Sequence, residues 1–143
     1  MIPLIVILAV IFGLLVFMWV SIAREPGPSA ADVALAYERA WDELDFSLLY
    51  DLSGDEMRDG MRRERFIAAK RAAYQKAGSH APIGADVEVE TSISGHQTAL
   101  VVTKVASGDS AVRNNVMLER RSNGWVVVGY SLRPDSEADA SAT

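Results

Sequence analysis

Five residues have side chains suited to lining a binding pocket: Tyr37, Trp41, Asp45, Asn114 and Tyr130. The aromatic rings could form apolar walls, and the carboxylate and amide could supply the few polar contacts typical of small-molecule sites. Ordinary packing offers another explanation, in which the aromatics are core residues, Asn114 is a buried amide and Asp45 caps a helix. No general base oriented by a second polar group is evident, so the pattern favours binding over catalysis.

The sequence lacks the residues that several other classes of catalytic and metal-binding site require. The chain has no cysteine, which excludes disulfides, thiol nucleophiles and zinc–thiolate sites. Asp55, Glu56 and Asp59 do not have the spacing of a calcium-binding loop, and His80 and His96 are too far apart in sequence to suggest a metal pair. We therefore expect no metal and no cofactor. The formal net charge of −5 also argues against nucleic acid as a partner.

A group of basic residues marks a second candidate surface. It comprises Arg58, Arg62, Arg63, Arg65, Lys70 and Arg71. The preceding segment, residues 32–56, is acidic. The simpler explanation is that two solvated helix faces of opposite charge lie near each other and attract. The functional alternative is a surface for anionic lipid or an acidic partner, which would require this helix to face a membrane.

The chain begins with an uncharged apolar run from Ile2 to Ala23, long enough as a helix to cross a bilayer. A signal peptide normally has a basic start and a shorter apolar core. We therefore predict a single-pass cell-membrane anchor in residues 1–23, with residues 2–23 contacting the bilayer. Arg24 follows the run and no basic residue precedes it, so the positive-inside rule favours a cytoplasmic soluble domain.

The rest of the chain predicts one domain over residues 30–133, between a Pro/Gly spacer at 24–29 and a disordered acidic tail at 134–143. Helical spacing of apolar residues predicts helices over 30–44, about 46–52 and about 62–77. The last of these would have an apolar edge of Phe66, Ala69 and Ala73, widened by Ile67 and Tyr74. From Asp86 the period changes to two, which predicts four strands joined by tight turns.

This order predicts an α+β fold, with three helices packed on a curved four-stranded antiparallel sheet and with Tyr37 and Trp41 in its concavity. Asn114 would be a polar group on an otherwise apolar face, so it would need a partner inside the domain. Alternation predicts which residues of the last two strands face the helices: Val112, Asn114, Val116 and Leu118 on the third, and Val126, Val128, Tyr130 and Leu132 on the fourth.

This order of helices and strands contains two motifs, Tyr37-x-x-Ala40-Trp41-x-x-Leu44-Asp45-x-x-x-Leu49-x-x-Leu52 and Gly124-Trp125-Val126-Val127. Together they resemble the nuclear-transport-factor-2-like cone fold, which includes ketosteroid isomerases and polyketide-cyclase-like proteins. The resemblance covers about residues 30–133. Catalytic members of that fold place a carboxylate base and a tyrosine or histidine inside the cone. No such residues can be carried over, because Asp86, Glu88 and Glu90 alternate with apolar residues and are expected to point outward.

An anchor ahead of such a domain is similar to small bacterial envelope proteins. We therefore predict a membrane-anchored, non-catalytic module for binding or assembly, whose sheet could mediate a homodimer or contact an envelope complex. The alternative is a tethered small-molecule-binding or isomerase-like enzyme that uses the cone interior. A titrating carboxylate inside the cone would favour the alternative, and an exposed apolar sheet face would favour assembly.

Overall fold

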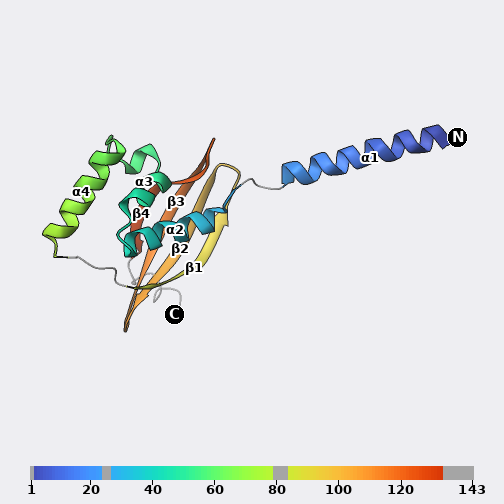
Figure 1. Cartoon of the computed structure of the whole chain (residues 1–143). Helices are drawn as coiled ribbons and strands as arrows, with labels where there is room; N and C mark the ends of the chain where they lie inside the picture. Colours follow the sequence, from blue (N-terminus) through green and yellow to red (C-terminus); the bar gives the residue numbers. More distant parts are fainter. Residues whose placement is uncertain (1, 24–26, 79–83, 134–143) are drawn as a thin grey trace.

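The structure is a computed structural model of the chain, in which residues 2–23, 27–78 and 84–133 are described. It consists of an N-terminal helix, α1 (Ile2–Ala23), followed by an α+β domain (Figure 1). The predicted tail at 134–143, most of the loop that holds His80 and half of the predicted spacer lie outside the described residues.

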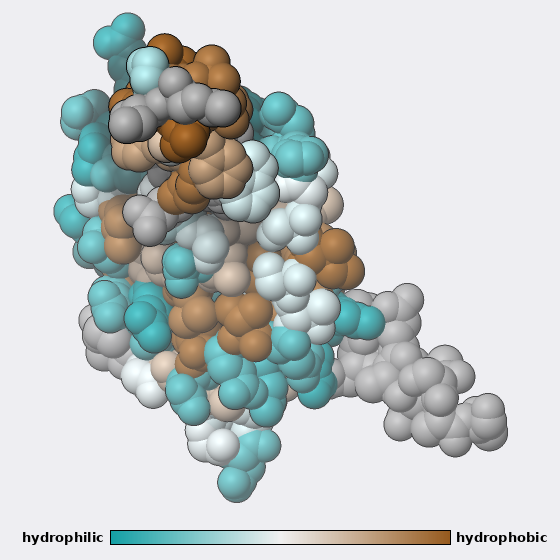
Figure 2. All heavy atoms as spheres, turned by 90° about the vertical axis from the view of Figure 1, so that its right-hand side faces the viewer, coloured by the Kyte–Doolittle hydropathy of each residue, from teal (hydrophilic) through white to brown (hydrophobic). Residues whose placement is uncertain are grey.

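Helix α1 lies apart from the domain (Figure 1). The stretch Pro3–Ser21 is long and apolar enough to cross a membrane, and none of it is buried. Figure 2 shows hydrophobic side chains gathered on α1, above a domain surface where they alternate with hydrophilic ones. A membrane anchor and a signal sequence share these properties. Among the described residues, the buried members of the hydrophobic core lie between Ala30 and Val127, so residues 27–143 contain this core without α1.

The predicted helical region forms three α-helices and one short 3₁₀ turn. They are α2 (Ala30–Asp42), α3 (Phe46–Leu52), η1 (Asp55–Met57) and α4 (Arg63–Lys76). Helix α2 begins at a capping box in which Ser29 and Asp32 satisfy each other's backbone N–H groups. Leu44 adopts a left-handed conformation with φ of 56°, which ends α2 and turns the chain into α3.

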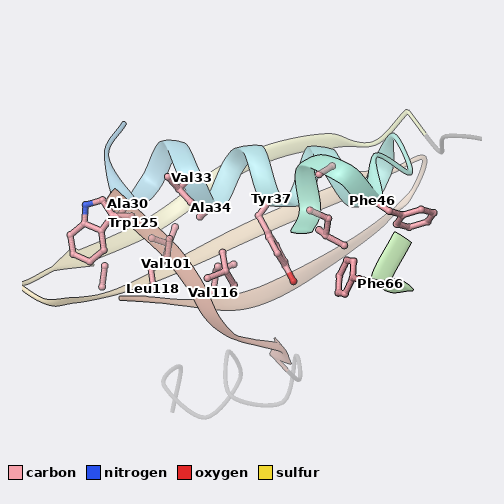
Figure 3. Packing of buried hydrophobic residues seen from close by; sticks show 14 residues of the cluster. Ala30, Val33, Ala34, Tyr37, Phe46, Phe66, Val101, Val116, Leu118 and Trp125 are labelled. Carbon is pink, nitrogen blue, oxygen red and sulfur yellow. The ribbon is translucent and has the colours of Figure 1, made fainter. Parts of the chain in front are cut away.

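Four strands form one antiparallel sheet in the order β1-β2-β3-β4. They are β1 (Asp86–Ser94), β2 (Thr98–Ser107), β3 (Ser110–Arg121) and β4 (Gly124–Arg133). Helix α2 lies across the inner face of this sheet (Figure 3), and the core side chains fill the space between them. The fold class is therefore the predicted one, an α+β domain with helices on a four-stranded antiparallel sheet.

A bulge in β4 changes which of its residues face inward. Met117 pairs with Gly129 but Leu118 pairs with Val127, so Val128 has no partner of its own on β3. Val127 is fully buried, and Tyr130 reaches the inner face beyond the bulge. The prediction that Val126 and Val128 face the helices was wrong, because strict alternation cannot anticipate an inserted residue.

Helix α4 packs along only part of the predicted edge: Phe66 belongs to the core, and Ile67 and Tyr74 pack against it. Phe66 is buried (Figure 3), and Lys70 and Tyr74 are half-buried beside it. Ala69 and Ala73 are exposed. The contact edge therefore follows an i, i+4, i+8 spacing from Phe66. Large rings, rather than close-packed alanines, join α4 to the rest of the domain, and Tyr74 stacks on Trp41 with ring centroids 5.8 Å apart.

Candidate functional site

A buried acid, Glu38 of α2, lies between this helix and the sheet, with only 3% of its surface exposed. Three side chains donate hydrogen bonds to it. The Thr103 hydroxyl and the Asn114 amide donate to Oε1 at 2.5 and 3.0 Å. The Tyr130 hydroxyl donates to Oε2 at 2.9 Å. Sequence analysis missed Glu38, because it counted this acid among the solvated charges of an acidic segment.

The sheet register brings the three donors together. Thr103 of β2 and Asn114 of β3 are directly paired, so their side chains stand next to each other on the inner face. Tyr130 of β4 pairs with Val116, one inward position further along β3, and it reaches this face because of the bulge. Each donor therefore comes from a different strand, and α2 supplies the acceptor.

Glu38 has no ion-pair partner among the residues that the structure describes. A buried carboxylate without a counter-charge is costly, and hydrogen bonds compensate only part of the lost hydration. The electrostatic effect is visible at its neighbour: burial, together with the Glu38 carboxylate, raises the pKa of Tyr130 far above its ordinary value. Tyr130 is therefore a neutral hydrogen-bond donor across the physiological range.

A cavity of about 470 Å³ opens beside this cluster, within the size range of sites for small organic ligands. Its walls combine three aromatic rings, several aliphatic side chains and a few polar groups. The aromatic residues are Trp41, Tyr74 and Tyr130; the aliphatic ones are Leu44, Ala85, Val105, Val112 and Leu132; the polar ones are Glu38, Asp42, Ser107, Ser110 and Asn114.

Two buried polar atoms of the cavity residues lack a hydrogen-bond partner within the described parts of the chain. They are the Asn114 Oδ1 acceptor and the Trp41 Nε1 donor. The Trp41 N–H lies near the Tyr37 hydroxyl but does not form a hydrogen bond of normal geometry with it. Unsatisfied buried polar groups are uncommon in folded proteins, and each costs about 1–3 kcal/mol. This region therefore contains more polar groups than packing alone requires.

The structure brings three of the five predicted pocket residues to the cavity, namely Trp41, Asn114 and Tyr130. Tyr37 lies behind the wall in the core, 2% exposed, with its ring 5.4 Å from that of Tyr130. Asp45 does not line the cavity. It is exposed and caps α3, where its side chain accepts a hydrogen bond from the Leu48 N–H.

The six basic residues of the second candidate surface are divided between several environments. Arg58 donates to the Tyr50 carbonyl and lies over the Tyr50 ring. Arg63 forms an ion pair with Asp51 that joins α4 to α3. Lys70 lies over the Trp41 and Phe66 rings. Arg62, Arg65 and Arg71 are exposed to solvent. In the described residues, no group of three potential metal ligands comes together.

Comparison with solved structures gives the fold of the domain. A Campylobacter jejuni protein described as a candidate NTF2-like transpeptidase matches 70% of this chain and 97% of its own, with a TM-score of 0.51 and 16% identity. An NTF2-like protein of unknown function from Silicibacter pomeroyi matches 73% and 94%, with a TM-score of 0.48 and 16% identity. The Bdellovibrio bacteriovorus protein Bd1075 matches 69% of this chain and 37% of its own, with a TM-score of 0.46 and 10% identity.

No family model and no curated protein sequence matches the chain. The match to the Campylobacter jejuni structure shows that the domain has the nuclear-transport-factor-2-like fold that the sequence resembles. The sequence identity to that structure is too low for the likeness to indicate a function. What the site does has to be argued from its own residues.

The role of Glu38 can be tested through stability. In Glu38→Gln the amide oxygen can keep the contacts with Thr103 and Asn114 while its nitrogen donates to the Tyr130 oxygen. We expect the free energy of unfolding to stay within about 1 kcal/mol of wild type. Glu38→Ala leaves buried donors without an acceptor and should lose about 2–4 kcal/mol. Urea denaturation of residues 27–143 measures both, with exposed Glu43→Ala as the control. Equal stability of the Glu38→Ala and Glu43→Ala variants would contradict this role.

Proposed function

We propose that the domain binds a small, mostly apolar molecule in its cone cavity and that α1 holds the domain at a membrane. The observation that supports binding most strongly is the combination of a cavity of about 470 Å³ with a buried carboxyl group at its wall. A domain built only for stability would leave fewer apolar side chains lining an open cavity, because apolar surface that stays in contact with water contributes no burial free energy. It would also avoid a carboxyl group that has no counter-charge.

The hydrogen bonds favour holding a ligand over proton abstraction. A general base must come within hydrogen-bond distance of the proton that it removes. Three side chains donate hydrogen bonds to Glu38, two to Oε1 and one to Oε2, and together they hold the carboxyl group in one orientation. This fixed carboxyl group is better placed to anchor one polar group of a ligand than to move toward a C–H bond. The isomerase-like alternative therefore has less support than binding.

Membrane attachment is proposed from α1. Its spanning stretch is apolar and unburied, and the domain core does not use it. We propose a retained single-pass anchor contacting the bilayer through residues 2–23, rather than a cleaved signal sequence. The position of Arg24 after the span favours a domain on the cytoplasmic side. A mostly apolar ligand would partition into the same membrane, so an anchored domain would hold its cavity close to the source of the ligand.

The cavity can be tested with naphthylmethanol as a neutral probe. We expect the ligand to shift the amide signals of cavity residues such as Val105 and Tyr130 in a nuclear magnetic resonance titration of residues 27–143. Val112→Trp should abolish these shifts, because Val112 lines the cavity and is 42% exposed, so that the larger ring can enter it. Ala111→Trp is the matched control, since the neighbouring residue on a strand points to the opposite face.

Either of two results would contradict the proposed binding site. In the first, the shifts spread over the surface or persist unchanged in Val112→Trp. In the second, no apolar probe of this size, neutral or charged, shifts the cavity residues at millimolar concentration. A set of shifts that is confined to the cavity and is lost in Val112→Trp but not in Ala111→Trp supports it.

The outer face of the sheet supports a second function, assembly. Ile93, Leu100 and Met117 are 66%, 38% and 48% exposed. They are consecutive cross-strand partners on β1, β2 and β3, so they form one apolar strip. Exposed apolar strips of this kind often mark protein interfaces. We propose that the strip joins two copies of the domain or contacts another envelope protein.

Self-association predicts a dimer of residues 27–143 in sedimentation equilibrium. Leu100→Glu should convert it to a monomer, because a charge in the middle of an apolar interface loses its hydration without gaining a partner. Ala72→Glu, on the exposed side of α4, is the control and should stay dimeric. A wild-type domain that remains monomeric at millimolar concentration would contradict self-association through this face.

A further inference from the structure

We infer that the cavity selects an apolar or aromatic amine in its protonated form, whose ammonium group donates a hydrogen bond to Glu38 Oε2. This inference rests on the proposed function, because it names the class of ligand for the same cavity. Three independent features of the wall point to a positively charged donor: its charge, its free acceptor position and its aromatic rings.

The charge of the wall is entirely acidic. Among the described residues that line the cavity, Glu38 and Asp42 supply carboxyl groups, and no lysine, arginine or histidine is present. The Lys70 ammonium nitrogen lies 5.6 Å from the Trp41 ring centroid, but Lys70 does not line the cavity. An ammonium group would supply the counter-charge that buried Glu38 lacks, whereas an anionic ligand would add to the repulsion.

Among the described residues, one acceptor position on Glu38 is left without a donor. Each carboxylate oxygen can accept about two hydrogen bonds. Oε1 accepts two, from Thr103 and Asn114, while Oε2 accepts one, from Tyr130. A protonated amine carries N–H donors and a positive charge together, so it can fill this position with a charge-assisted hydrogen bond. A quaternary ammonium group has no N–H to donate and would leave the position empty.

The aromatic residues suit the same cation. Trp41 and Tyr74 stack with their ring centroids 5.8 Å apart, and Tyr130 stands next to Glu38. All three rings line the cavity. The faces of indole and phenol rings attract ammonium groups, by about 0.5–1 kcal/mol at exposed sites and more in dry ones. The aliphatic wall of Val105, Val112 and Leu132 would then contact the apolar part of the ligand.

The end of α2 adds to the negative potential. Asp42 is the last residue of this helix, and Glu38 lies about one turn before it. The aligned peptide dipoles of a helix leave a partial negative charge at its C-terminal end, so this end favours a cation. Asp42 is held in place by the Ala85 N–H, which donates to its Oδ1. The helix dipole, the two carboxyl groups and the aromatic rings therefore all favour a cation in the cavity.

The test compares three probes of nearly the same shape: naphthylmethylamine, naphthylmethanol and naphthoic acid. Their dissociation constants are measured at neutral pH and physiological salt with residues 27–143. We expect the amine to bind at least about tenfold more tightly than the alcohol, and the carboxylate to bind most weakly. In Glu38→Gln the amine should lose this advantage while the alcohol keeps its affinity. Glu43→Gln changes the net charge equally at the exposed end of α2 and should leave the advantage intact.

The outcomes separate this inference from the proposed function. Equal binding of amine and alcohol, or a preference for the carboxylate, would overturn the inference and leave the cavity as a binding site. An amine preference that survives in Glu38→Gln would also overturn it, because the charge would then be recognised elsewhere. If none of the three probes binds in the cavity, the proposed function itself fails. An amine preference lost in Glu38→Gln alone supports both.

Discussion

The hydrogen-bond cluster around Glu38 is the constraint on which the rest of the domain depends. A carboxyl group inside an apolar cone is tolerated only when donors surround it, and here β2, β3 and β4 each supply one. The cluster requires Thr103 and Asn114 to be paired in register and requires the β4 bulge to turn Tyr130 inward. It therefore fixes the sheet register and the position of α2 at the same time.

Helix α2 consequently has two functions along its length. Its first half presents small apolar residues, such as Ala30, Val33 and Ala34, to the buried faces of the sheet (Figure 3). Its second half presents Glu38 and Asp42 to an open cavity. The first half provides the stability that lets the second half keep polar groups buried and partly unpaired. Such local conflicts with good packing are typical of functional sites.

Much of this architecture could be predicted from the sequence, because helical spacing and strand alternation are local signals. The need of Asn114 for an internal partner was predicted as well, and Glu38 is that partner. Glu38 itself was overlooked because acids on helices are usually solvated. The available signal was its spacing: it follows Ala34 by four residues and precedes Trp41 by three, which places it on the apolar stripe. The β4 bulge had no comparable signal, since every residue from Trp125 to Val128 is apolar.

The measurement that tests the central claim most directly is a crystal structure of residues 27–143 with bound naphthylmethylamine. The account predicts the ring inside the cavity between Val112 and Trp41, with the amine nitrogen about 2.7–3.2 Å from Glu38 Oε2 and the three protein donors still in place. A ligand bound only on the outer surface would contradict it. So would an inner cavity in which Glu38 has turned away to pair with a basic side chain of the protein.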